Sequence, residues 1–212
     1  MSNEKMMKYY FKIQNDKRQA YQIENKGTLR FPEVIFIGDS IVEFFKLETY
    51  FKTSKVIANR GISAYTSENL LDYLDTHVFG DKLETVFILI GTNDIGLSIP
   101  KEKTVENIKQ IIKKIKEKYS YLTIVLLEIL PVNTVEFDLS RFGMRDNQTI
   151  ASLNNAYENL TLQFERVTLL KTHDAFLNNE EQLTVAYTKD GLHLTDKGYQ
   201  ILAELINQTN LL

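Results

Sequence analysis

The chain has 212 residues, a length that suits one domain with its own hydrophobic core. Its net charge of −3 and its lack of cysteine argue against a nucleic-acid partner, an anionic membrane surface, disulfides and thiolate metal sites. No apolar run reaches the ~20 residues of a membrane span, and charges interrupt the N-terminus, so we expect a cytoplasmic protein without a membrane span.

Residues 1–30 are the first expected element, a helical extension that precedes a single domain at 31–212. Tyr10, Ile13 and Tyr21 follow helical spacing and predict an aromatic stripe on this extension. Helices that lie on membranes usually carry a richer basic face. We therefore expect the extension to pack on its own domain or on a twin subunit. The second arrangement would make the protein a homodimer.

The domain that follows alternates between short apolar runs and helical patterns. Near-continuous apolar runs are typical of strands that are covered on both faces. Strand–helix alternation predicts a parallel sheet with helices on both sides, a three-layer α/β/α architecture with five strands. The expected strands are 33–38, 55–58, 85–90, 123–127 and 166–170, and the expected helices are 66–75, 101–118, 147–164 and 196–207.

Chemistry in such sheets collects where the strands end. The first strand runs into "IGDS", which places Ser40 at a strand-to-helix turn. His193 stands in "DGLH" before the last helix, and Asp190 lies three residues earlier, across Gly191. A hydroxyl nucleophile, an imidazole base and a carboxylate that orients the base are the groups that acyl transfer needs. A tight turn at Gly191 would bring the Asp190 carboxylate onto the imidazole.

Two further strand ends offer donors for an oxyanion. Asn93 lies in "GTND" and Gly61 in "NRGI", and the side-chain amide of the first and the N–H of the second can bind negative charge beside Ser40. Each candidate also has a purely structural interpretation. Ser40 can cap a helix, Asn93 can serve a turn, Gly61 can supply a positive φ angle, and Asp190 can be an ordinary loop carboxylate.

The other two histidines are weaker candidates for the base. His173 has Asp174 beside it, but neighbouring residues of an extended chain point in opposite directions. His77 follows a predicted helix, where we expect it to cap the helix or to face solvent. Three histidines without a cluster predict no metal site, and the proposed chemistry needs no cofactor.

The four blocks stand in the order typical of one family, and the chain resembles the SGNH, or GDSL, hydrolase superfamily over roughly residues 33–203. The residues that give the family its name match Ser40, Gly61, Asn93 and His193. "NRGISAYTS", "EILPVN" and "DGLHLTDKGY" are most similar to the branch of the platelet-activating-factor acetylhydrolase catalytic subunits and bacterial lysophospholipase-like esterases. Leu194 departs from the proline that many members carry there.

The resemblance implies a flavodoxin-like fold and a serine esterase acting on a small-molecule ester. Ser40, His193 and Asp190 would form the triad, and the N–H groups of Ser40 and Gly61 with the amide of Asn93 would form the oxyanion hole. The chain shows no long lid insertion, so we expect an open cleft and a short acyl group such as acetyl. By position, the residues expected to line or support the cleft are Asp39, Arg60, Ile62, Thr92, Ile95 and Leu192.

Several alternatives stay open at this point. The connection 132–147 carries Arg141 and Arg145, which either bind an anionic leaving group or face solvent. The enzyme could act on longer acyl chains as a lysophospholipase or thioesterase, or transfer the acyl group to an alcohol. A non-catalytic α/β module that binds a sugar or a protein is the rival from another class.

Overall fold

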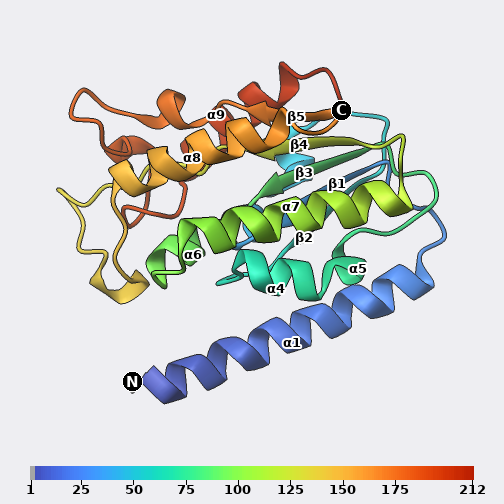
Figure 1. Ribbon diagram of the computed structural model, residues 1–212, viewed down its shortest axis with the longest axis horizontal. Helices are drawn as coiled ribbons and strands as arrows, with labels where there is room; N and C mark the ends of the chain where they lie inside the picture. The colour runs from blue at the N-terminus through green and yellow to red at the C-terminus, as the bar shows by residue number, and fades with distance from the viewer. Residues whose placement is uncertain (1–2) are drawn as a thin grey trace.

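The computed structural model describes residues 3–212 and has one parallel sheet at its centre (Figure 1). The strand order is β2-β1-β3-β4-β5, and every neighbouring pair is parallel. This confirms the predicted three-layer α/β/α architecture with five strands. The strands are β1 Val34–Gly38, β2 Ile57–Gly61, β3 Thr85–Leu89, β4 Thr123–Leu127 and β5 Val167–Leu170.

Alternate residues of each central strand face opposite sides of the sheet, and each side has its own core. In β1, Ile35 and Ile37 join one apolar cluster, whereas Val34 and Phe36 join the other. Both faces are therefore buried, which is why the strands read as continuous apolar runs.

One face of the sheet is covered by α1, α4, α5, α7 and α8, which Figure 1 shows in front of and below the strands. The other face is covered by α2, α3 and α9. The short helix α6 follows β3 at the edge where the strands end. The bounds are α1 Asn3–Gly27, α2 Ser40–Glu43, α3 Leu47–Tyr50, α4 Ser67–Asp72, α5 Leu74–His77, α6 Thr92–Gly96, α7 Lys101–Lys118, α8 Asn147–Thr161 and α9 Asp196–Asn207. Three single 3₁₀ turns complete the set, η1 Ser140–Phe142, η2 His173–Phe176 and η3 Val185–Tyr187.

The second strand differs from its predicted bounds in a way that matters for the site. The sequence suggested that the strand ends before Asn59, but β2 continues to Gly61, which pairs with Gly38. A Cβ atom added at Gly61 would lie 2.3 Å from the backbone nitrogen of Glu43 in α2. Gly61 is therefore required where α2 crosses the end of β2, whatever its conformational freedom.

The predicted helix 66–75 is interrupted at Tyr73 and forms α4 and α5, and the predicted helix 147–164 ends at Thr161. Helix α1 lies beside α5, and its N-terminal end points toward the side of the molecule that carries α6 (Figure 1). None of the helices in the described part of the chain has the length and apolar character needed to cross a membrane.

Candidate active site

Ser40 sits at the sharp turn that leaves β1. The Asp39 carboxylate accepts the N–H of Ile41 at 2.9 Å and so caps α2, with Ser40 as the first helical residue. Asp39 thus shapes the turn. The turn chemistry and a nucleophile at this position are compatible, because the capping residue is Asp39 and not Ser40.

Three side chains form a continuous hydrogen-bonded row at the edge where the strands end. Ser40 Oγ lies 3.0 Å from His193 Nε2, and His193 Nδ1 lies 2.9 Å from Asp190 Oδ2. The Ser40 side chain and the imidazole come from segments 153 residues apart in the chain. The sequence-predicted nucleophile, base and orienting carboxylate are therefore brought together.

The carboxylate and the imidazole are positioned by one local turn. Asp190 Oδ1 accepts the backbone N–H of His193 at 2.8 Å and that of Leu192 at 3.2 Å. Gly191 makes the turn with φ +85°, and an added Cβ would lie 2.6 Å from the carbonyl oxygen of Asn133. Burial raises the pKa of Asp190, but the N–H groups and the imidazole of His193 outweigh it, so the net pKa is lowered. The group is an anion at neutral pH.

Aromatic side chains and an arginine flank this row. The rings of Phe44, directly after α2, and of Phe142, in η1, lie 5.8 and 5.4 Å from the His193 ring. Arg141 Nη2 lies 3.3 Å from Asp190 Oδ2, the same oxygen that faces the imidazole. The connection 132–147 therefore forms a wall of the site.

Asn93 in α6 is held on both ends of its amide. Its Nδ2 donates to the carbonyl oxygen of Tyr65 at 2.9 Å, and its Oδ1 accepts from Arg145 Nη2 at 2.9 Å. Arg145 is buried and also donates from Nε to the carbonyl oxygen of Thr92 at 3.0 Å. An arginine has no acceptor, so these contacts fix which end of the Asn93 amide is the donor. One N–H of Nδ2 remains for a substrate oxygen.

The N–H of Gly61 is already used inside the protein. It donates to Asn59 Oδ1, two residues earlier in the same strand, at 2.9 Å. β2 is an edge strand, so on its outer side no neighbouring strand is present to accept this N–H. Ala64, three residues on, has a positive φ of 60° in a turn closed by the Tyr65 N–H on the carbonyl oxygen of Ile62 at 3.2 Å. No hydrogen bond within the described chain uses the N–H of Ala64 or that of Ser40. The N–H of Ala64 is therefore available to a substrate oxygen, whereas that of Gly61 is occupied.

Two predicted cleft residues lie elsewhere. Arg60 turns away from the site toward α1, where it pairs with Glu24 at 3.2 Å and lies over the Tyr21 ring at 4.6 Å. Ile62 is fully buried in the core. Arg60 is drawn toward α1 by its charge and ring contacts, whereas the Ile62 side chain packs inside one of the two apolar clusters. Ile95 lines a separate cavity of about 240 Å³ that it shares with Met144.

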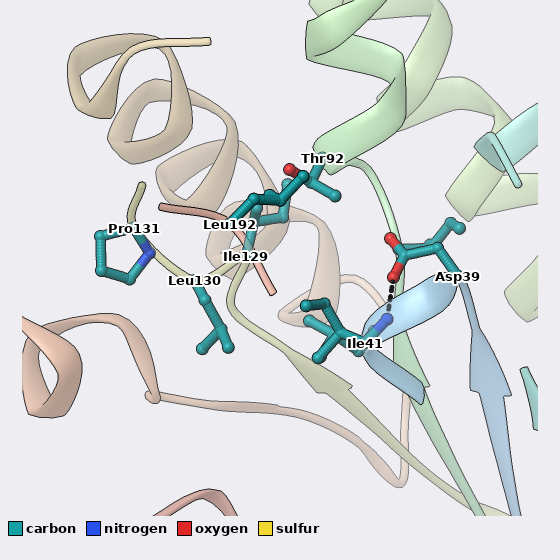
Figure 2. Close-up of a pocket in the computed structure, with 9 residues that line it drawn as sticks. Asp39, Ile41, Thr92, Ile129, Leu130, Pro131 and Leu192 are labelled. Carbon is teal, nitrogen blue, oxygen red and sulfur yellow. Dashed lines mark hydrogen bonds between the residues drawn. The ribbon is translucent and has the colours of Figure 1, made fainter. Parts of the chain in front are cut away.

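Asp39, Thr92 and Leu192 do line a common small recess, which Ser40 itself does not line. Its other walls are Ile41, Leu89, Ile90, Ile129, Leu130 and Pro131 (Figure 2). Its volume is about 10 Å³, roughly what a single water molecule requires. Burial raises the pKa of Asp39 to about 7, against the opposing effects of the Ile41 N–H and of Arg145.

The two remaining histidines differ from expectation. His77 neither caps a helix nor faces solvent: it is buried, and its Nδ1 lies 2.8 Å from the carbonyl oxygen of Arg60. Burial lowers its pKa to about 4. His173 and Asp174 do touch, at 3.2 Å, because η2 is a 3₁₀ turn and not an extended segment. The imidazole that reaches Ser40 is nevertheless that of His193. Within the described residues, no group of three His, Asp or Glu side chains is placed to hold a metal ion.

Comparisons with known proteins bear on the family and the fold. Residues 36–201 match the model of the GDSL-like Lipase/Acylhydrolase family. A Streptococcus pneumonia structure, provisionally described as a platelet activating factor, is 36% identical with a TM-score of 0.95, covering 99% of this chain and 97% of that one. A GDSL-like lipase from Bacteroides thetaiotaomicron is 28% identical with a TM-score of 0.77, covering 91% of this chain and 96% of its own.

A curated relative is the N-acylneuraminate cytidylyltransferase of Escherichia coli, which is 29% identical over 193 residues. The match covers 89% of this chain but 41% of the relative. The chain thus spans about two fifths of that protein's length.

Proposed function

Because the chain belongs to the GDSL-like lipase/acylhydrolase family and is a hydrolase, we propose that it is a serine esterase that cleaves short-chain carboxylic esters through an acyl-enzyme. The observation that carries this proposal is the unbroken row from Ser40 Oγ through His193 to Asp190 Oδ2, with separations of 3.0 and 2.9 Å. Both lie within the reach that proton transfer requires.

The proposed reaction follows from these contacts. His193 Nε2 accepts the proton of Ser40 as Oγ attacks the ester carbonyl, and the tetrahedral intermediate forms. The imidazolium then donates a proton to the leaving alcohol, and the acyl group stays on Ser40. Water then attacks the acyl-enzyme with His193 again as the base, the bond between the acyl carbon and Ser40 Oγ breaks, and the imidazolium returns a proton to Oγ as the carboxylic acid leaves. The anionic Asp190 holds Nδ1 protonated and stabilises the imidazolium throughout.

The oxyanion is proposed to bind to three donors. These are the N–H of Ser40, the N–H of Ala64 and the remaining N–H of the Asn93 amide. The first two are free of acceptors within the described chain, and the third is oriented by Arg145. Donors that are already aimed at the developing charge lower the barrier, because they need not reorganise during the reaction.

The proposed acyl group is short. The recess behind Asp39 and Ile41, the chain neighbours of Ser40, has about 10 Å³ of space and is closed by apolar side chains such as Leu192 and Leu130 (Figure 2). An acyl group would enter it only if these side chains moved apart, and a short group needs the smallest movement. The neighbouring 240 Å³ cavity at Ile95 and Met144 is the place to look if longer chains are accepted.

A second feature favours an anionic alcohol portion. Arg141 reaches Asp190 but keeps 67% of its side chain exposed, so its guanidinium can contact a negative group on the leaving alcohol. The Escherichia coli relative is named for an N-acylneuraminate, which is a sugar carboxylate. Acetylated sugar acids are therefore a substrate class to test beside neutral acetyl esters and phospholipid analogues.

The experiment is a hydrolysis screen in which acyl length and head group vary independently, with Ser40→Ala as the control for background. We expect turnover to fall as the acyl chain lengthens beyond acetyl, and to vanish in Ser40→Ala. Equal turnover of acetyl and long-chain esters would contradict the short acyl site. The screen also compares hydrolysis with alcoholysis of one ester. If an added alcohol takes the acyl group as readily as water does, the protein is an acyltransferase.

A further inference from the structure

Helix α1 lies outside the family match at 36–201, yet it contacts the segment next to the proposed oxyanion hole. Three of its side chains, on one helix face, bond to that segment. Gln14 Nε2 donates to the carbonyl oxygen of Ser63 at 3.1 Å, Arg18 Nη1 donates to the Tyr65 hydroxyl at 3.2 Å, and the Tyr21 hydroxyl donates to the carbonyl oxygen of Gly61 at 2.8 Å.

A fourth α1 residue acts through a side chain of α2. Lys17 Nζ lies 3.4 Å from Glu43, and Glu43 Oε2 accepts both the N–H and the hydroxyl of Ser63 at 2.6 Å. Ser63 and Ala64 are the central residues of the turn 62–65. Contacts from α1 therefore reach this turn on its Ser63 side, directly and through Glu43.

This turn needs external support. Ala64 has φ 60°, a conformation that costs free energy for a residue with a Cβ atom. Glycine would adopt it freely, so at an alanine the surroundings must hold the backbone in place. The contacts of α1 to Ser63 and Tyr65, on either side of Ala64, provide such support.

Two of the three proposed donors, the N–H of Ala64 and the amide of Asn93, depend on this turn. The N–H of Ala64 belongs to it, and its Tyr65 carbonyl oxygen accepts one N–H of Asn93. A shift of the turn would therefore misplace the N–H of Ala64 and would also break the hydrogen bond that holds the Asn93 amide. Misplacement of a reacting group by ~1 Å can reduce a rate ~10²-fold.

We propose that α1 is a positioning element of the oxyanion hole, in which Gln14, Arg18 and Tyr21 hold the turn 62–65 so that Ala64 and Asn93 present their N–H groups to the substrate. This inference rests on the proposed esterase function. It gives the N-terminal helix a role in turnover that simple packing of an extension on the domain would not require.

The test compares two ways of weakening α1. Gln14→Ala combined with Arg18→Met removes the contacts to Ser63 and Tyr65. Asn25→Ala is the matched control, because Asn25 also bonds from α1 to the domain but outside the turn 62–65. It donates to the carbonyl oxygen of Thr76 in α5 at 2.9 Å and accepts from Arg60 Nη2 at 3.2 Å. Steady-state kinetics on one acetyl ester and the thermal midpoint are measured for each.

We expect the double variant to lose ~10-fold or more in kcat with KM little changed, because the donors act on charge that appears in the transition state. Asn25→Ala should keep kcat within about twofold at a similar loss of thermal stability. The inference is overturned if kcat is unchanged in the double variant, or if both variants lose kcat in proportion to their stability.

A second readout does not need esterase activity. Amide hydrogen exchange at Tyr65, whose N–H closes the turn on Ile62, should accelerate in the double variant and not in Asn25→Ala. If wild-type protein hydrolyses no ester, the proposed function fails and this measurement alone decides. Unchanged exchange at Tyr65 would then overturn the role of α1.

Discussion

The two halves of the candidate site are built in opposite ways. On the acid–base side, Asp190 and His193 are three residues apart, and one turn at Gly191 sets their geometry. On the oxyanion side, the proposed donors come from α2, from the turn 62–65 and from α6, and they are held by α1 and Arg145. The first half depends on local sequence, whereas the second depends on contacts between distant segments.

Substitutions in the two halves should therefore reduce activity in different ways. A change in the local turn removes the base or its orientation outright. A change in the long-range supports leaves every reacting group present but less well placed, so its effect should be graded.

On the acid–base side, we expect the largest loss of kcat from substitution of Asp190. Asp190→Asn replaces the carboxylate with an amide that can hold the imidazole in the wrong tautomer, and the same change in a chymotrypsin-type triad costs ~10⁴ in kcat. Asp190→Ala should lose less, because water or a nearby carbonyl can still accept the Nδ1 proton. Kinetics of both variants on one acetyl ester would check the order. If Asp190→Ala were the more damaging, the carboxylate would do more than select the tautomer.

The oxyanion half should lose less when one donor is removed. Asn93→Ala deletes a donor that acts on transition-state charge, so we expect kcat to fall by ~10²–10³ with KM nearly unchanged. The same assay that compares the Asp190 variants measures this. A rise in KM alone would mean that Asn93 binds the ground-state substrate and that the oxyanion assignment is wrong.

The supports of the oxyanion half should give a smaller and separable loss. Arg145→Lys keeps a buried cation but removes the guanidinium that orients Asn93 and holds Thr92, so kcat should fall by ~10-fold. Arg166→Lys, at an exposed arginine that bonds to the carbonyl oxygen of Tyr121, is the control and should change the turnover of a neutral ester by less than about threefold. Thermal midpoints separate positioning from unfolding. Equal losses in the two variants would contradict a specific role for Arg145.

The smallest effect on activity is expected at Asp39, where stability is the readout. Its pKa in the folded protein is about 7, above the ordinary 3.8, so the folded state binds more protons between these values. Stability is therefore lost as pH rises through this window. Asp39→Asn keeps an oxygen to cap α2 and removes the ionisation. The difference in unfolding free energy, variant minus wild type, should be more positive at pH 8 than at pH 5 by about 1 kcal/mol or more. A difference independent of pH would show that Asp39 does not titrate there.

The same contrast explains what could be predicted from the sequence. The alternation of apolar runs and helical patterns fixes the layers and most element bounds, because each element's periodicity is local. Ser40, Asp190 and His193 could be found for a related reason, since glycine-containing turns mark them at short spacing.

The oxyanion side could not be predicted as fully. The sequence pointed to Gly61, a glycine next to a strand, but its N–H donates to Asn59 Oδ1, and the donor proposed in its place is the N–H of Ala64. An alanine at positive φ leaves no signal in composition or spacing. Arg145 and α1 were equally hidden, because a side chain that supports a residue about 50 positions away in sequence has no local pattern to reveal it.

The central claim is that Ser40 Oγ attacks the ester carbonyl, and covalent labelling tests it most directly. Wild-type protein is treated with a serine-reactive fluorophosphonate, and the adduct is located by peptide mass spectrometry. The account predicts a single adduct on Ser40 and none in Ser40→Ala. An adduct on another residue, or equal labelling of Ser40→Ala, would contradict it.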